Sequence, residues 1–136
     1  MPPLEAARSG GRRVLIVDDD EPIVKMLTKF FTELGGYEIA TAADGLDAGV
    51  QVARFHPDLV LLDIEIPKVD GIAVCRKIKA DPATRNAQVL IMTGFGTPEH
   101  RKAVATCGAD GFIAKPFALP ALKRWVREHV RDGGTR

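Results

Sequence analysis

The sequence alternates five short apolar runs with segments of helical periodicity, and this alternation constrains the fold more than any other feature. The runs are rich in branched aliphatic residues and lie at 13–17, 37–42, 58–64, 88–94 and 111–116. Runs of this length and composition are typical of strands, and strands that alternate with one-faced helices are typical of parallel sheets. The sequence therefore predicts an α/β fold, a doubly wound (βα)5 domain with a five-stranded parallel sheet.

The segments between the runs carry the stripes and end signals of helices. After the first run, apolar residues recur at the spacing of one helix face, at Ile23, Met26, Leu27, Phe30, Phe31 and Leu34. A second helix is expected at about 45–54, with Asp44 as its capping residue. Leu46, Val50 and Ala53 form the apolar side of that helix.

Composition and charge exclude several classes of protein. The chain has 136 residues and is 46% hydrophobic, which suits one globular domain. Cys75 and Cys107 are its only cysteines, so a disulfide framework is not expected. Residues 14–114 hold 10 Lys or Arg and 15 Asp or Glu, and an acidic body argues against direct nucleic-acid binding. No apolar run is long enough to span a membrane, and the first residues lack a signal peptide's apolar core. We therefore expect a cytoplasmic protein.

Charged and polar residues gather where four of the predicted strands end. The first strand runs into three consecutive aspartates at 18–20. Asp63 ends the third strand, Thr93 ends the fourth, and Lys115 follows the fifth. Ligands of doubly wound sheets bind at the carboxyl ends of the strands. The sequence therefore predicts a site at that edge with at least three carboxylates, one hydroxyl and one ammonium group.

This set of groups suits phosphoryl chemistry with a divalent metal. Clustered carboxylates remain ionised at low cost only when a cation is near, and hard oxygen ligands favour Mg²⁺. We therefore expect Mg²⁺ (or Mn²⁺) as the cofactor. A carboxylate can attack a phosphoryl group, while a metal, a lysine and a hydroxyl can stabilise the charge on the group in transfer.

Four motifs give the chain a specific resemblance to the receiver domains of two-component response regulators. They occur in the order of that family and over nearly the whole chain, and four motifs together are far more specific than one. The motifs are "VLIVDDDEP", "DLVLLDIEIPKVDG", "VLIMTG" and "GFIAKPF".

The resemblance implies a fold and domain limits. It implies a flavodoxin-like sheet with strand order 2-1-3-4-5 and a receiver domain over residues 12–131. Residues 1–11 are then expected to be a disordered N-terminal tail. Residues 132–136 are expected to be a C-terminal tail or the start of a linker.

The resemblance also implies catalytic and switch residues. Asp63 matches the aspartate that accepts the phosphoryl group, and Lys115 matches the lysine beside it. Thr93 matches the hydroxyl that binds the phosphoryl group and takes part in the switch. Phe112 matches a switch aromatic that turns inward on activation, although plain packing is at least as good an interpretation of this residue. The Lys115–Pro116 bond is expected to be cis.

A metal site is implied by the same resemblance. Its expected ligands are Asp18, Asp19, Asp63 and the backbone carbonyl of Glu65. The other two acids of the first motif, at 20–21, are better explained as entry residues of the following helix.

Two bulky or charged residues depart from the commonest family pattern. Glu65 places an extra negative side chain at the rim of the site, and Phe95 lies two residues after Thr93. Both border the path of an attacking water, and we hypothesise that they lengthen the phosphorylated lifetime.

The resemblance implies a signalling module rather than an enzyme acting on a separate metabolite. The module would take its phosphoryl group from a sensor histidine kinase or a histidine phosphotransfer protein. It would catalyse only its own phosphorylation and dephosphorylation, and would signal to a downstream effector protein or domain. Phosphorylation-linked dimerisation is compatible with this function.

Two alternatives remain open at this point. One is a small phosphatase with an aspartate nucleophile, which Asp63-Ile64-Glu65 superficially resembles. The other is a receiver fold that binds its partner without phosphorylation.

Overall fold

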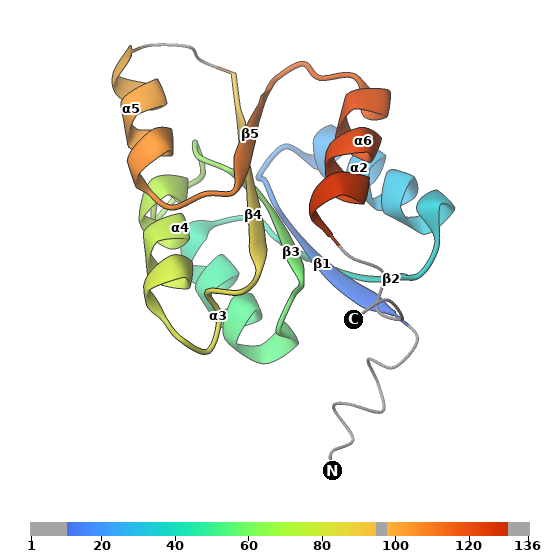
Figure 1. Ribbon diagram of the computed structural model, residues 1–136, viewed down its shortest axis with the longest axis horizontal. Coiled ribbons are helices and arrows are strands. Elements are labelled where there is room, and N and C mark those ends of the chain that lie inside the picture. The colour runs from blue at the N-terminus through green and yellow to red at the C-terminus, as the bar shows by residue number, and fades with distance from the viewer. Residues whose placement is uncertain (1–10, 95–97, 131–136) are drawn as a thin grey trace.

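The computed structural model describes residues 11–94 and 98–130, which form one sheet with helices on both faces (Figure 1). The strands are β1 (Arg12–Val17), β2 (Tyr37–Ala42), β3 (Leu59–Asp63), β4 (Gln88–Thr93) and β5 (Gly111–Ala114). The helices are α2 (Glu21–Leu34), α3 (Gly45–Phe55), α4 (Gly71–Ala80), α5 (Pro98–Thr106) and α6 (Leu119–His129).

All four strand pairings are parallel, and the strand order is β2-β1-β3-β4-β5. The predicted α/β class and the order 2-1-3-4-5 are therefore confirmed. The register pairs Val17 with Leu62 and Asp63 with Met92, so the central strands end at nearly the same level. The residues directly after β1 and β5 and the last residues of β3 and β4 consequently lie at one edge of the sheet.

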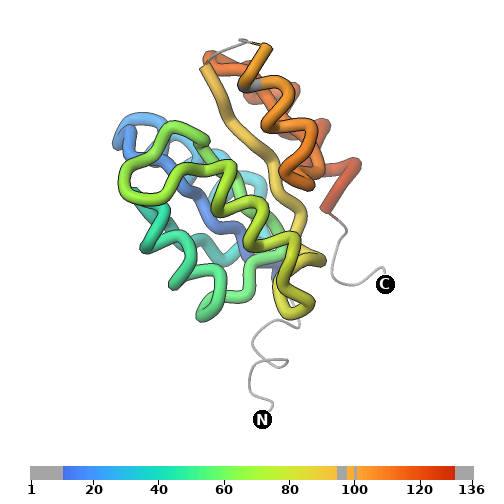
Figure 2. Tube along the Cα trace, turned by 90° about the vertical axis from the view of Figure 1, so that its left-hand side faces the viewer, coloured from blue at the N-terminus to red at the C-terminus, as the bar shows by residue number. Residues whose placement is uncertain are grey.

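Alternate strand residues point to opposite faces and form two separate cores. One face carries α3, α4 and α5, and the other carries α2 and α6 (Figure 1). Figure 2 looks onto the first face and shows α3 and α4 side by side across it. The middle residues of β1, β3 and β4 are buried on both faces, as expected for parallel strands covered by helices on both sides.

Cys75 of α4 and Cys107, which directly follows α5, both lie in the core on the first face of the sheet. Cys75 and Cys107 are buried and have free thiols. Burial raises the pKa of the Cys75 thiol, so this thiol stays protonated and behaves as a small apolar side chain.

Three helices of the described residues begin at an aspartate that caps a backbone amide. Asp44 accepts a hydrogen bond from the amide of Asp47 at 2.7 Å, and Asp70 accepts one from Ala73 at 2.9 Å. Asp20 accepts a longer bond, 3.4 Å, from the amide of Ile23. These caps satisfy first-turn amides that have no partner within the helix.

Helix α3 presents its predicted apolar side to solvent. Leu46 is 58% exposed and Val50 50% exposed, and Ala53 is exposed as well. The residues that pack on the sheet are smaller on average, namely Gly45, Ala48 and Val52. An apolar stripe on a helix normally faces the core. In α3 the side with the smaller residues packs on the sheet, and the larger apolar residues remain exposed.

The rotation of α3 is explained by its close contact with the loop after β3. The Gly45 amide donates a hydrogen bond to the Pro67 carbonyl at 3.0 Å. A Cβ atom on Gly45 would lie 1.9 Å from the Val69 carbonyl oxygen, so only glycine fits at this position. This contact fixes which side of the helix faces inward.

No helix among the described residues is long and apolar enough to cross a membrane.

Two glycines of α3 should respond in opposite directions to alanine substitution. Gly45→Ala should lower the free energy of unfolding by about 1–3 kcal/mol because the new methyl group collides with backbone. Gly49→Ala should raise it by about 0.5–1 kcal/mol, because a Cβ atom there meets no atom within 4 Å. Urea unfolding of both variants measures the difference, and equal effects would contradict the packing described for Gly45.

Candidate active site at the carboxyl edge of the sheet

The predicted site residues converge at the carboxyl edge of the sheet. Asp18 directly follows β1, Asp63 ends β3, Thr93 ends β4, and Lys115 directly follows β5. Asp18, Asp63 and Thr93 are only 1%, 6% and 4% exposed, whereas Asp19 is exposed to solvent. Burial of polar side chains at the ends of apolar strands costs free energy unless hydrogen-bond or charge partners compensate for it. The partners of these side chains therefore show how the fold tolerates them.

Lys115 joins the two buried carboxylates. Its Nζ atom lies 2.7 Å from Asp18 Oδ2 and 3.3 Å from Asp63 Oδ2. The three side chains come from segments separated by 97 and 52 residues, so the sheet alone brings them together. One ammonium group between two carboxylates leaves one net negative charge, and the exposed carboxylate of Asp19 adds a second.

Each buried carboxylate is also held by an amide of its own loop. Asp18 Oδ1 accepts from the Asp20 amide at 3.0 Å, and Asp63 Oδ1 accepts from the Glu65 amide at 3.0 Å. In both cases the donor lies two residues after the acid, which is the usual geometry of an Asx turn. One oxygen of each carboxylate is therefore fixed by backbone, and the other faces Lys115.

The pKa values of Asp18 and Lys115 are shifted by burial and by the charges of their neighbours. Burial raises the pKa of Asp18, as does the neighbouring Asp63 charge, although the bond from Lys115 opposes both. Burial alone would lower the pKa of Lys115, but its contacts with Asp18 and Asp63 outweigh burial and hold that pKa above its ordinary value. The lysine is therefore a permanent cation, and the carboxylates still carry more negative charge than it neutralises.

The donor groups fit a hard divalent cation. Ligand oxygens of Asp18, Asp19 and Asp63 all lie within 4.8 Å of one another, and oxygen-only sets of this kind favour Mg²⁺. The backbone carbonyl of Glu65 accepts no hydrogen bond from any residue in the described part of the chain. That oxygen is therefore available to a cation, and its role as a metal ligand stays a prediction.

Thr93 and Lys115 are linked through the backbone. The Lys115 amide donates a hydrogen bond to the Thr93 carbonyl at 2.7 Å, which ties the end of β5 to the end of β4. The Lys115–Pro116 peptide bond is cis, as predicted.

Phe112 occupies an outward-facing position of β5. Its side chain is 58% exposed, so it is not a packing residue in this conformation. Its role as a switch that turns inward stays a prediction, and Phe95, the other aromatic of interest, lies outside the described residues.

One supporting residue, Gly71, was not singled out from the sequence. A Cβ atom on Gly71 would lie 2.6 Å from the Asp63 carbonyl oxygen and 2.5 Å from the Ile64 Cα. Glycine therefore allows the loop after β3 to fold back against the strand end that carries Asp63. The signal was present in "KVDG", where an aspartate cap and a glycine come together, but nothing in one sequence shows what the glycine must approach.

Comparison with known proteins decides the family. The model of the response regulator receiver domain matches residues 14–127. This chain belongs to the response regulator receiver domain family. Response regulator PleD of Caulobacter vibrioides is 42% identical over 120 residues, which cover 88% of this chain and 26% of PleD. The regulator RpaA of Synechocystis, a DNA-binding dual master transcriptional regulator, is 34% identical over 119 residues and is covered to 49%.

The chain therefore spans between about a quarter and a half of the length of these curated relatives. A relative's DNA-binding activity is a property of that whole protein.

Solved receiver domains share the fold over almost their whole length. The receiver domain of a histidine kinase from Syntrophus aciditrophicus has a TM-score of 0.85 and 30% identity, and covers 93% of this chain and 94% of its own. The receiver domain of the sensor histidine kinase PA1611 of Pseudomonas aeruginosa has a TM-score of 0.80 and 26% identity, and covers 88% of this chain and 98% of its own. That structure holds a magnesium ion coordinated in the active-site cleft.

Alanine variants of Asp19 and Asp20 should distinguish the contribution of metal binding to stability from that of helix capping. With saturating Mg²⁺, about 100 times the dissociation constant, a bound cation adds about 2.7 kcal/mol to the free energy of unfolding. Asp19→Ala should lose most of that gain while being no less stable than the parent without metal, because a repelling charge is removed. Thermal unfolding across a Mg²⁺ titration measures both effects.

Asp20→Ala is the matched control for that experiment. It should cost about 0.5–1 kcal/mol through the lost helix cap and keep the full response to Mg²⁺. An undiminished Mg²⁺ response in Asp19→Ala would show that the wrong acid had been assigned to the metal.

Proposed function

We propose that this receiver domain accepts a phosphoryl group on Asp63, in a reaction that depends on Mg²⁺ (or Mn²⁺), and thereby changes its partner-binding surface. The observation that carries the proposal is the Lys115 ammonium group, which contacts the buried carboxylates of Asp18 and Asp63 at 2.7 and 3.3 Å. A purely structural ion pair needs one carboxylate. The second carboxylate and the adjacent Asp19 supply negative charge in excess of what the fold neutralises.

The residues divide the chemistry among them. An oxygen of Asp63 attacks the phosphorus atom of a phosphohistidine, the new O–P bond forms as the N–P bond breaks, and the imidazole leaves. A metal held by Asp18, Asp19, Asp63 and the Glu65 carbonyl would neutralise charge on the phosphoryl oxygens.

Lys115 and Thr93 act on the same phosphoryl group. Lys115 exchanges its bond with Asp63 Oδ2 for a phosphoryl oxygen, so its charge stays compensated throughout. The Thr93 hydroxyl donates a hydrogen bond to another phosphoryl oxygen. Movement of Thr93 toward the phosphoryl group then opens space into which Phe112 turns.

The proposed partners follow from this chemistry. The phosphoryl donor is a sensor histidine kinase or a histidine phosphotransfer protein of the cytoplasm, and the receiver of the signal is a downstream effector protein or domain. The receiver domain, over residues 12–131, catalyses only its own phosphorylation and dephosphorylation. The acidic body argues against direct contact with nucleic acid.

Incubation of the purified chain with Mg²⁺ and acetyl phosphate tests the proposal. Mass spectrometry should show one added phosphoryl group in the parent and in Asp20→Asn, which keeps a good helix cap, and none in Asp63→Asn. Sustained hydrolysis of unrelated phosphomonoesters would instead indicate an aspartate-dependent phosphatase. No modification of the parent, and no binding of beryllium fluoride, would indicate a phosphorylation-independent interaction module.

The lifetime of the phosphorylated form tests the residues at the rim. Glu65 is exposed beside Asp63, and we expect its charge to repel an attacking hydroxide-like water. Glu65→Asn and Phe95→Ala should each speed the loss of the phosphoryl group, measured as decay after removal of the donor. Unchanged decay in both variants would reject this role.

A further inference from the structure

An apolar stripe on α3 is left uncovered by the other residues that the structure describes. Its members recur at the spacing of one helix face, at Leu46, Gly49, Val50 and Ala53, and all four are exposed. Among the described residues, three large hydrophobic side chains are more than a third exposed, and two of them are Leu46 and Val50. Two such residues one turn apart on a helix are typical of an interaction surface.

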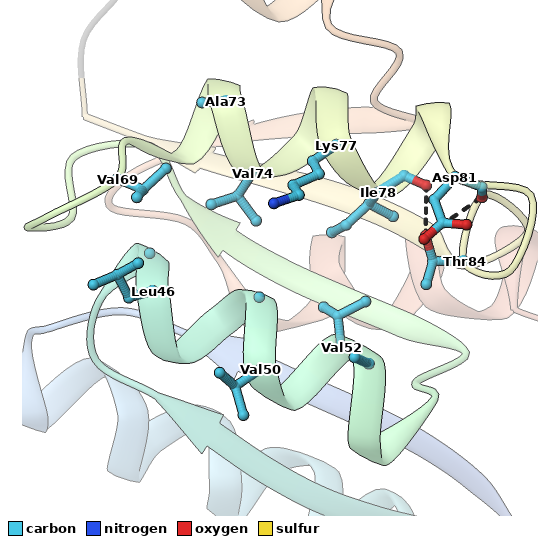
Figure 3. A pocket seen from close by; sticks show the side chains of 13 residues that line it. Leu46, Val50, Val52, Val69, Ala73, Val74, Lys77, Ile78, Asp81 and Thr84 are labelled. Atoms are coloured by element: carbon cyan, nitrogen blue, oxygen red, sulfur yellow. Dashed lines mark hydrogen bonds between the residues drawn. The ribbon is translucent and has the colours of Figure 1, made fainter.

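The neighbouring helix does not cover this stripe. A groove of about 550 Å³ lies between α3 and α4 (Figure 3). Val74 and Ile78 of α4 point down toward α3 in Figure 3, whereas Val50 points away from α4. The stripe therefore forms the α3 side of this groove and is exposed, so another molecule can reach it.

No contact within the described part of the chain requires a glycine at position 49. It lies in the middle of α3, does not have a positive φ, and a Cβ atom on it would meet nothing within 4 Å. Glycine in the middle of a helix costs about 0.5–1 kcal/mol relative to alanine. A glycine that its own fold does not need is explained when another backbone or side chain approaches at that point.

We propose that α3 is a self-association surface, through which two copies of the receiver domain pair with their α3 helices antiparallel about a two-fold axis. The axis passes between Gly49 and Val50, close to the middle of α3. In a symmetric pair each residue meets a different residue of the second copy, and the reverse contact is then automatic. The sequence of α3 is complementary to its own reverse in both size and charge.

Size complementarity follows from the order of the stripe. With the axis between positions 49 and 50, Val50 lies opposite Gly49 of the second copy. Leu46 lies opposite Ala53 of the second copy by the same symmetry. Each large side chain therefore meets a small one at all four contacts, which is the alternation that close helix packing requires.

Charge complementarity follows from the residues that flank the stripe. Asp47 and Arg54 lie on the same flank of α3, one near each end of the helix. Among the described residues, no ion pair joins either side chain to another part of the chain. The two-fold axis places Asp47 of one copy near Arg54 of the other, and Arg54 near Asp47, so both charges gain a partner.

The size of the surface sets the strength of the association. An 11-residue helix is about 16 Å long, and one pair of such helices buries less than the roughly 1,200 Å² of a stable standard interface. The pair therefore forms and separates with protein concentration. This surface is distinct from the candidate active site and does not depend on phosphoryl transfer.

Exchange of the flanking charges provides the decisive test. Asp47→Arg alone and Arg54→Asp alone each place like charges opposite one another twice per pair, so each should raise the dissociation constant about tenfold or more. A mixture of the two variants restores opposite charges at both contacts. The mixture should therefore form a mixed pair that is at least tenfold tighter than either variant alone.

Sedimentation equilibrium of the full chain over a wide concentration range measures these constants. Glu33→Arg makes the same change of charge on an exposed position of α2, on the other face of the sheet, and should leave the constant unchanged. Gly49→Leu fills the space opposite Val50 and should abolish pairing, while thermal unfolding shows the monomer still folded.

Three results would overturn the proposal. A parent chain that remains monomeric at every concentration would show that α3 is not a self-association surface. A pair that survives Gly49→Leu must form through another face. A mixture of the two charge variants that associates no more tightly than each alone shows that Asp47 and Arg54 do not meet.

Discussion

The contact of one ammonium group with two buried carboxylates is the interaction on which this structure depends. Asp18 and Asp63 end two adjacent apolar strands, where burial makes each charge costly. Lys115 follows the edge strand β5, and its ammonium group lies 2.7 Å from Asp18 and 3.3 Å from Asp63. Because the lysine satisfies less than the whole negative charge, the site is stable enough to fold and still attractive to a cation. A fully neutral site would have no such affinity.

The fold could be predicted almost completely from the sequence because its signals are local and agree with one another. Short apolar runs, aspartate caps and helix-ending glycines or prolines each specify a neighbouring stretch of backbone. The positions of Asp63, Thr93 and Lys115 at strand ends then follow from parallel topology. The contacts that were not predictable are those between loops and helices. Gly45 and Gly71 are determined by carbonyl groups of residues at or after the end of β3, and no local pattern reveals which atoms a glycine must approach.

Helix α3 shows where a periodicity argument fails and why. The rule that an apolar stripe faces the core assumes that the core is the best available place for that stripe. In α3 the hydrogen bond from Gly45 to Pro67 sets the rotation of the helix, and the small residues Gly45 and Ala48 allow close approach to the sheet. The buried residues of the helix therefore lie on that side, against the sheet. The larger stripe stays exposed and is therefore available for the intermolecular contact proposed for α3.

The loop after β3 connects these two parts of the molecule. It begins at Asp63, folds back over Gly71, and touches α3 through the Gly45 amide and through an ion pair of 3.4 Å between Lys68 and Asp44. Lys68 has a φ of 74°, a conformation that a residue other than glycine rarely adopts, so the loop is held by its contacts rather than by local preference. One end of this loop therefore supports the backbone around Asp63. The other end sets the rotation of α3, and hence the direction in which Leu46 and Val50 face.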